Sequence, residues 1–169
     1  MIVATSARIL TITAPSTTKI AFEDLQAEHS LHAFHAFGAS KACNLLFTYA
    51  LAQRLASTNV TVNAIYPGLV KSSLMREAPI PLRWLTSLFA QSPESVAQSL
   101  VYYASSVEVQ AMTGLLFNKG RQPIDSSSST KDRAVQQQLW EVSMALAPFL
   151  IKYIIYPLKQ SISHIIVLK

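Results

Sequence analysis

The stretch Val-Thr-Val-Asn-Ala-Ile-Tyr-Pro-Gly at residues 60–68 decides the fold, because a run rich in β-branched residues is stopped by proline and glycine. Such a run, ended by a turn signal, predicts a buried strand. It closely follows residues 39–56, which contain no proline or glycine and carry apolar side chains on most faces. That pattern predicts a helix covered on more than one side. A helix leading into a strand is typical of a β-α-β unit.

The same alternation extends along the rest of the chain. The other predicted elements are a strand at 8–13, a long loop with at most one helical turn at 15–38, a helix at 93–105, a strand at 114–118 and a helix at 130–146. The helix at 93–105 has the clearest start, because Ser92 offers a capping hydroxyl and Pro93 suits the first helical position. Strands separated by helices predict an α/β fold with a short parallel sheet of three strands, flanked by helices.

Composition excludes several classes of protein. Of the 169 residues, 50% are hydrophobic and 14% are charged, which excludes intrinsic disorder. The formal net charge is +5, but the basic residues are scattered, so we predict no nucleic-acid partner. The single cysteine, Cys43, excludes an internal disulfide and suits a reducing compartment, so we expect a cytoplasmic protein in which Cys43 serves packing. The N-terminus lacks the pattern of a signal peptide.

Residues 148–169 form an apolar, basic tail, which we separate from one domain predicted for residues 1–147. From Val142 onward the chain has no acidic residue, and Pro148 and Pro157 interrupt the apolar runs. A membrane-spanning helix needs about 20 apolar residues without such breaks. The tail is therefore predicted to be a helix packed on the domain or a segment lying on a membrane surface.

Four stretches of the sequence form an ordered set. They are Arg-Ile-Leu-Thr-Ile-Thr-Ala at 8–14, Phe-Glu-Asp-Leu-Gln at 22–26, Phe-Gly-Ala-Ser-Lys-Ala-Cys-Asn-Leu-Leu-Phe-Thr at 37–48, and Val-Thr-Val-Asn-Ala-Ile-Tyr-Pro-Gly-Leu-Val-Lys-Ser at 60–72. The set resembles the short-chain dehydrogenase/reductase family, most closely its retinol-dehydrogenase-like branch, and Leu-Trp-Glu at 139–141 resembles that branch too. A Ser-Lys dipeptide alone would carry no weight, but the ordered set is specific and covers about residues 4–147.

The resemblance implies a Rossmann-type sheet in the order 3-2-1-4-5-6-7, of which this chain holds the last three strands, so that it corresponds to the C-terminal half of the domain. The family binds NAD(P) through a glycine-rich turn at a helix N-terminus, which cradles the pyrophosphate. This sequence has four glycines, Gly38, Gly68, Gly114 and Gly120, and they form no such cluster. We therefore expect NAD(P) as the family cofactor but no tight binding by this chain alone.

The resemblance also assigns the catalytic positions. In the family, a tyrosine four residues before a lysine exchanges a proton with the substrate oxygen, and the lysine ammonium lowers the tyrosine pKa and holds the nicotinamide ribose. The lysine is kept as Lys41, but Phe37 stands at the tyrosine position. The family's serine pair falls at Thr13-Ala14, which puts Ala14 at the substrate-binding position. Loss of a positioned acid usually costs about 10²–10⁴-fold in rate.

A second family contact falls in the stretch after the strand at 60–66. Pro67, Gly68, Leu69 and Val70, with Ser72, match the loop whose backbone and hydroxyl contact the nicotinamide end of the cofactor. Together with Lys41, these residues are the predicted cofactor-binding set.

Other residues offer alternatives at the site. Ser16 lies two residues past Ala14, and a slip of the alignment would place its hydroxyl in the serine position. His35 is a candidate substitute proton donor. His29, His32 and His35 stand three apart, which is not the spacing of the paired histidines in zinc helices, so no metal site is predicted.

Three hypotheses about function follow. The first is a family member that is truncated and catalytically inactive alone, a pseudoenzyme. The second is an NAD(P)-dependent oxidoreductase of lipophilic alcohols or carbonyls, completed by a missing N-terminal half; Met1 falls where the preceding family helix would end. The third is an interaction module or a membrane-surface protein held by its tail. Under the first hypothesis the missing strands leave one edge of the first strand unpaired, so we expect self-association or a partner chain covering that edge and the helix 39–56.

Overall fold

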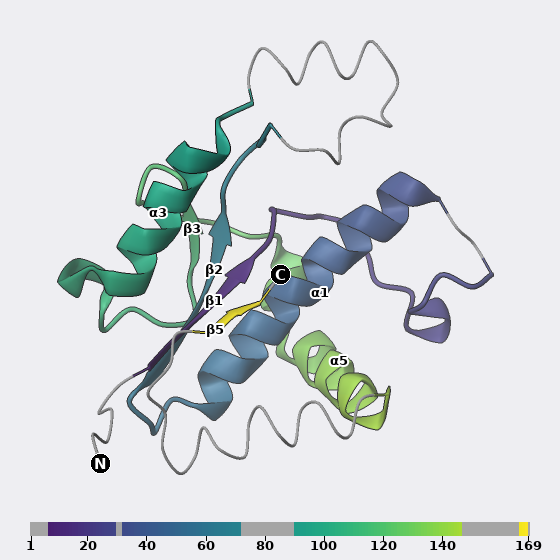
Figure 1. The fold of residues 1–169 in the computed structure, drawn as a ribbon. Coiled ribbons are helices and arrows are strands. Elements are labelled where there is room, and N and C mark those ends of the chain that lie inside the picture. The colour runs from purple at the N-terminus through teal and green to yellow at the C-terminus, as the bar shows by residue number, and fades with distance from the viewer. Residues whose placement is uncertain (1–6, 30–31, 72–89, 147–165, 169) are drawn as a thin grey trace.

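Parallel strands form the centre of the molecule (Figure 1). The computed structural model describes residues 7–29, 32–71, 90–146 and 166–168. Strands β1 (Ala7–Ile12), β2 (Val60–Tyr66) and β3 (Leu116–Asn118) are neighbours in parallel pairs, in the register Ile9 opposite Val62 and Ala64 opposite Leu116. This arrangement confirms the predicted α/β fold with a short parallel sheet, whose three main strands are those expected from the sequence.

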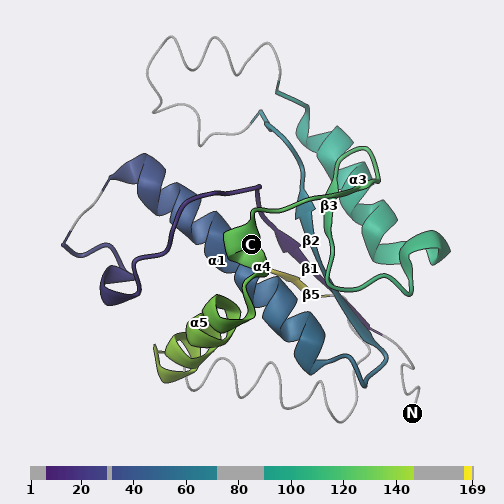
Figure 2. The same ribbon diagram turned by 180° about the vertical axis from the view of Figure 1, so that it is seen from behind.

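The helices lie on both faces of the sheet. Helices α1 (Ala33–Arg54) and α5 (Arg133–Leu146) cover one face, and α3 (Pro93–Ser105) covers the other (Figure 1). The four-residue helix α4 (Ser128–Lys131) leads into α5 (Figure 2), and short 3-10 turns occupy Phe22–Asp24 and Val107–Val109. The predicted start of α3 is confirmed, because the Ser92 side chain accepts a hydrogen bond from the backbone N–H of Ser95.

Alternation along the strands divides the core between the two faces. On the α1 face, Ile9 and Val62 pack against Leu51 and Leu55. On the α3 face, the buried residues are Leu10, Ile65, Tyr103, Val109 and Phe117. Each face of the central strands is therefore buried, which explains why the apolar stretch Ala64–Ile65 of β2 does not alternate with polar residues and why even Asn63 is buried.

Helix α1 begins at Ala33, whereas the sequence predicted a loop as far as residue 38. The predicted helix began at residue 39 because the stretch without proline or glycine starts there, just after Gly38, and glycine weakens helix interiors. In the structure, tertiary packing offsets that cost: a Cβ at Gly38 would lie 2.2 Å from Oγ1 of Thr18, so the loop approaches the helix more closely than any other residue would allow. The alanine-rich stretch on either side then continues as one helix.

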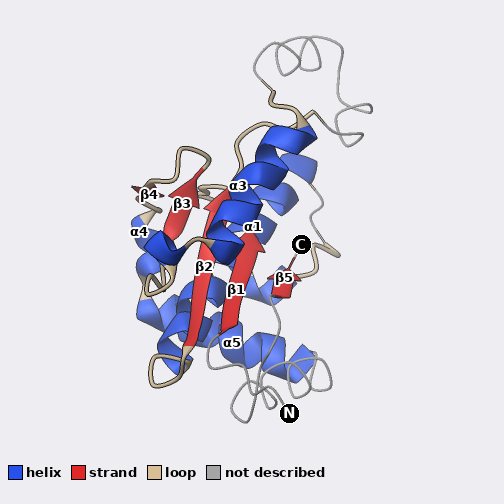
Figure 3. Ribbon diagram, turned by 60° about the vertical axis from the view of Figure 1, so that its left-hand side comes forward, coloured by secondary structure: helices blue, strands red, loops and turns tan. Residues whose placement is uncertain are grey.

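Two short strands that the sequence did not predict extend the sheet to the order β4-β3-β2-β1-β5. Strand β4 (Pro123–Ile124) pairs antiparallel with β3, and β5 (Ile166–Leu168) pairs parallel with Ile9–Thr11 of β1. Figure 3 shows β5 beside β1. Part of the edge that was expected to be unpaired is therefore covered by the chain itself, and an additional partner there stays a prediction.

The predicted tail lies mostly outside the described residues, which resume only at residue 166. Residues 166–168 form a strand rather than the helix or surface segment that was expected. Among the helices that the structure describes, none combines the length and the apolar character needed to cross a bilayer.

Candidate functional site

The predicted catalytic positions meet at the carboxyl edge of the sheet. Thr13 and Ala14 directly follow β1, and α1 starts at the same edge because it runs antiparallel to the strands. Oγ1 of Thr13 donates a hydrogen bond to the backbone carbonyl of Lys41 at 2.9 Å. Nδ2 of Asn44 reaches the carbonyl of Ile12 at 3.4 Å. These two contacts fix the first half of α1 against the end of β1, at the edge where parallel sheets bind ligands.

Phe37 and Lys41 lie one helical turn apart and face each other. Nζ of Lys41 is 5.3 Å from the centre of the Phe37 ring, within the range of a cation–π contact. The Phe37 side chain is 51% exposed, so a group approaching from solvent could reach the ring. The geometry of a ring next to an ammonium is present, but the ring has no hydroxyl and cannot transfer a proton.

Ser16, the alternative to Ala14, is buried and its hydroxyl is engaged twice. Its Oγ donates to the carbonyl of Gly38 at 2.8 Å and accepts from the backbone N–H of Thr18 at 3.2 Å. These bonds join the loop to α1 beside Phe37, which favours a structural role for the Ser16 hydroxyl. Ala14 itself is partly buried and contributes a methyl group.

The loop after β2 adopts a conformation that depends on glycine and on one residue that the sequence analysis missed. Gly68 has φ +78°, a backbone conformation that residues with a Cβ rarely adopt. Nε2 of Gln91 donates to the carbonyl of Pro67 at 2.7 Å, and the Gln91 backbone pairs with Leu69 and Lys71. No sequence signal identifies Gln91, because its contact spans 24 residues.

Some of the predicted residues lie elsewhere. Ser72 is outside the described residues. His29 approaches Asp24, with Nδ1 and Oδ1 3.2 Å apart, and the hydrogen bonds from His29 help to lower the pKa of Asp24. His35 lies on α1. In the described part of the chain, no three His, Cys, Asp or Glu side chains gather closely enough to hold a metal ion.

A cavity of about 510 Å³ lies between the loop at residues 20–27, the first half of α1 and α5. His35, Ser40, Cys43 and Leu139 are among its lining residues. Cys43 is partly buried, and burial raises the pKa of its thiol to about 11. A thiol that stays protonated is a poor nucleophile, so Cys43 is unsuited to covalent catalysis.

We therefore expect Cys43 in the native chain to react with Ellman's reagent at pH 8 about a hundredfold more slowly than an ordinary free thiol, because far less thiolate is present. The absorbance of the released thiolate measures the rate. Unfolding in urea serves as the control and should restore an ordinary rate. Equal rates in the native and unfolded chains would contradict the buried environment.

Comparison with known proteins places these features in a family context. The model of the family described as short chain dehydrogenase matches residues 22–80. Human retinol dehydrogenase 14 is 35% identical over 137 residues, which cover 78% of this chain and 40% of the relative. Mouse retinol dehydrogenase 12 is 35% identical and zebrafish (Danio rerio) polyprenol dehydrogenase is 31% identical, each over 76% of this chain and 41% of the relative. The chain thus spans about two fifths of the length of the curated relatives it matches.

A solved structure shares the fold. An uncharacterized protein from Mycobacterium paratuberculosis superimposes with a TM-score of 0.59 at 24% identity, over 85% of this chain and 51% of that chain. At this identity the likeness concerns the fold alone.

Proposed function

Because the chain belongs to the short-chain dehydrogenase family, we propose that it keeps the scaffold of the family's nicotinamide end without the acid–base chemistry, and acts as a pseudoenzyme domain. The observation that carries this proposal is the contact between Lys41 and the ring of Phe37. A lysine in that position serves the family by stabilising a phenolate, and here it faces a ring with no ionisable group. Ala14 has no hydroxyl, so the second polar contact that the family makes to its substrate is missing here.

In this proposal, the residues present would hold one end of the family cofactor. Lys41 and the loop Pro67–Gly68 lie at the carboxyl edge of the sheet, where a nicotinamide ribose would bind. The cofactor, when bound in the family, supplies or accepts a hydride. This sequence contains no glycine-rich turn that would offer backbone N–H groups to the pyrophosphate. The family's hydride transfer needs both those phosphate contacts and a proton donor, and Phe37 cannot serve as that donor.

An alternative function is supported by the retinol dehydrogenase relatives. In it, the chain contributes to an NAD(P)-dependent oxidoreductase of lipophilic alcohols or carbonyls, whose phosphate-binding half is supplied elsewhere. Both functions use the same edge of the sheet. They differ in what happens when a phosphate-binding half is supplied: the pseudoenzyme stays inactive, whereas the oxidoreductase gains turnover.

The test is titration of the chain with NADPH, followed by cofactor fluorescence, together with a turnover assay on a lipophilic aldehyde. We expect no binding at micromolar NADPH and no turnover from the wild type or from the double variant Phe37→Tyr with Ala14→Ser. Binding of NADPH with micromolar affinity would show that the chain has an independent cofactor site, contrary to this expectation. Turnover by the double variant would favour the oxidoreductase instead.

Phe37→Tyr on its own tests the geometry without requiring activity. The introduced hydroxyl would sit on a ring close to the Lys41 ammonium, so we expect its pKa to fall below the ordinary value of about 10, because a nearby positive charge favours the phenolate. NMR titration of ¹³C-labelled tyrosine measures the pKa. The variant that also carries Lys41→Met is the matched control and should titrate higher; identical curves would show that Lys41 does not act on this ring position.

A further inference from the structure

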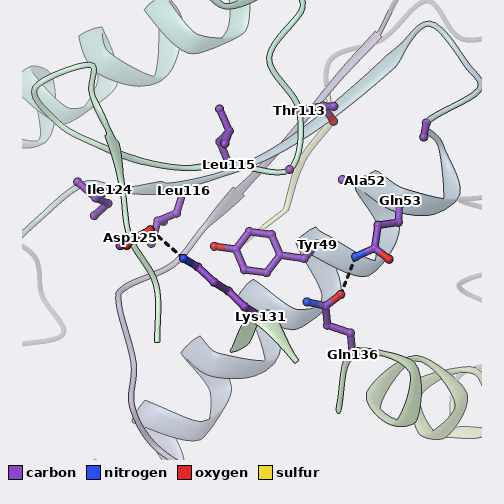
Figure 4. A pocket seen from close by; sticks show the side chains of 12 residues that line it. Tyr49, Ala52, Gln53, Thr113, Leu115, Leu116, Ile124, Asp125, Lys131 and Gln136 are labelled. Atoms are coloured by element: carbon purple, nitrogen blue, oxygen red, sulfur yellow. Dashed lines mark hydrogen bonds and ion pairs between the residues drawn. The ribbon is translucent and has the colours of Figure 1, made fainter. Parts of the chain in front are cut away.

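A second cavity, of about 450 Å³, lies between the second half of α1, strands β3 and β4, and the start of α5 (Figure 4). Lys41 and Ala52 are eleven residues apart on α1, so the cavity is about 16 Å along the helix from the predicted catalytic edge. It is therefore separate from the site described above. Its volume falls in the range of small-molecule sites.

Most of the cavity wall is apolar and has no side chain filling it. Leu116 and Ile124 line it from the two strands, and Ala52 lines it from α1. A Cβ placed at Gly114 would lie 3.6 Å from Cβ of Ala52, so two small residues face each other where a larger pair would close the space. Gly114 has φ +70°, which disfavours any other residue at that place.

One end of the cavity is lined by neutral groups. Nε2 of Gln53 donates to Oε1 of Gln136 at 2.8 Å, and the buried Gln136 donates in turn to the carbonyl of Thr130 at 2.9 Å. The first bond ties α5 to α1, and the second ties α5 to the end of α4. This end therefore presents no charge to a ligand.

One cation lines the cavity and points along it. Nζ of Lys131 is 2.8 Å from Oδ1 of Asp125, and Figure 4 shows the Lys131 side chain reaching past the ring of Tyr49 towards Asp125. The hydroxyl of Tyr49 donates its proton to Oγ of Ser126 at 2.9 Å. The Tyr49 oxygen can therefore accept a hydrogen bond from a ligand but cannot donate one. Lys131 is therefore the charged donor available to a molecule in the cavity.

The Lys131–Asp125 pair does not satisfy the ammonium. An ammonium carries three N–H groups, and Asp125 accepts from one of them. The Asp125 side chain is 94% exposed and the Lys131 side chain 52% exposed. Water screens the carboxylate, and exposed pairs of this kind contribute little to stability. Asp125 also lines the cavity, but its side chain is almost fully exposed and water screens its charge, so the N–H groups of Lys131 that Asp125 does not engage favour an anion.

From these contacts we propose that the cavity binds a small amphipathic carboxylate. The apolar body lies against Ala52, Leu116 and Ile124, and the carboxylate accepts hydrogen bonds from Lys131. Charge-assisted bonds to carboxylates are stronger than bonds between neutral groups, so the ammonium selects an acid over an alcohol of equal length. This binding uses none of the predicted catalytic residues, and it goes beyond the proposed function.

Sodium octanoate, below its micellar concentration, tests the proposal by ¹H–¹⁵N NMR of the full chain. We expect saturable shifts at the amides of Ala52, Gly114 and Leu115, with weaker binding of 1-octanol and of octylammonium. Lys131→Met should weaken octanoate binding about tenfold, as expected for one charge-assisted hydrogen bond. Lys19→Met removes an exposed lysine that does not line the cavity, and should leave the affinity unchanged.

A second variant guards against an effect of folding. Ala52→Leu directs a larger side chain into the cavity and should abolish the octanoate shifts, while the urea midpoint remains close to that of the wild type. If the midpoint falls, Ala52→Leu has disturbed folding, and the octanoate affinity of Lys131→Met, a surface change, decides whether the proposal holds. The proposal is overturned if octanoate gives no saturable shifts at millimolar concentration, if octanol or octylammonium binds as tightly, or if Lys131→Met leaves the affinity unchanged.

Discussion

Tyr103→Ala should lower the free energy of unfolding by about 3–5 kcal/mol, the usual cost of removing a buried aromatic side chain. Tyr103 is 2% exposed, and its ring lies 4.9 Å from that of Phe117, centre to centre. Its hydroxyl donates to the carbonyl of Asn118 at 2.7 Å. Since domains are stable by about 5–15 kcal/mol in total, this loss is a large fraction of the stability. Urea unfolding followed by circular dichroism measures it.

Tyr103→Phe is the matched control, because it keeps the ring and removes the hydroxyl. Burial raises the pKa of Tyr103 to about 12, so the hydroxyl remains protonated at neutral pH and donates its bond. Losing that one hydrogen bond should cost about 1 kcal/mol. If Tyr103→Ala cost no more than Tyr103→Phe, α3 would not depend on the ring for its packing on the sheet.

The parts of the fold that could be predicted from sequence are those whose signals are local. The β-branched run at residues 60–66 and the capped start at Ser92 specify their elements without help from distant residues. The start of α1 could not be predicted because Gly38 is accommodated by Thr18, twenty residues away in sequence. Strands of two or three residues such as β4 carry no periodic signal, and Pro123 is tolerated in β4 because that strand lies at an edge of the sheet.

The features of the candidate site also divide into those that the sequence could predict and those that it could not. The family motif paired Phe37 with Lys41, although the predicted helix began only at residue 39; in the structure α1 includes both residues, so the spacing of four places their side chains on one face and in contact. The support given by Gln91 to Pro67 depends on tertiary structure, and so does the cavity around Lys131, whose walls come from residues between 49 and 136. Chemistry carried by a motif is visible in the sequence, whereas a space enclosed by distant elements is not.

Trp140→Ala should lower the free energy of unfolding by about 3 kcal/mol, because Trp140 joins α5 to α1. Its ring stacks on that of Phe47, with centres 5.4 Å apart and planes 15° from parallel. The guanidinium of Arg54 lies 4.0 Å from the centre of the Trp140 ring. The expected loss is at the lower end for a tryptophan because Trp140 is only partly buried. Urea unfolding of the variant measures it.

Arg54→Met separates the charge from the packing. It retains an apolar stem against Trp140 but removes the cation–π contact and the hydrogen bond to Gln137, so about 1 kcal/mol should be lost. Because α5 also carries Gln136, which lines the second cavity, Trp140→Ala should weaken octanoate binding more than Arg54→Met does. If Trp140→Ala and Arg54→Met were equally stable, the stacked Trp140 ring would not be the main contact between the two helices. A large loss of stability in Trp140→Ala with unchanged octanoate affinity would show that the cavity does not depend on the docking of α5.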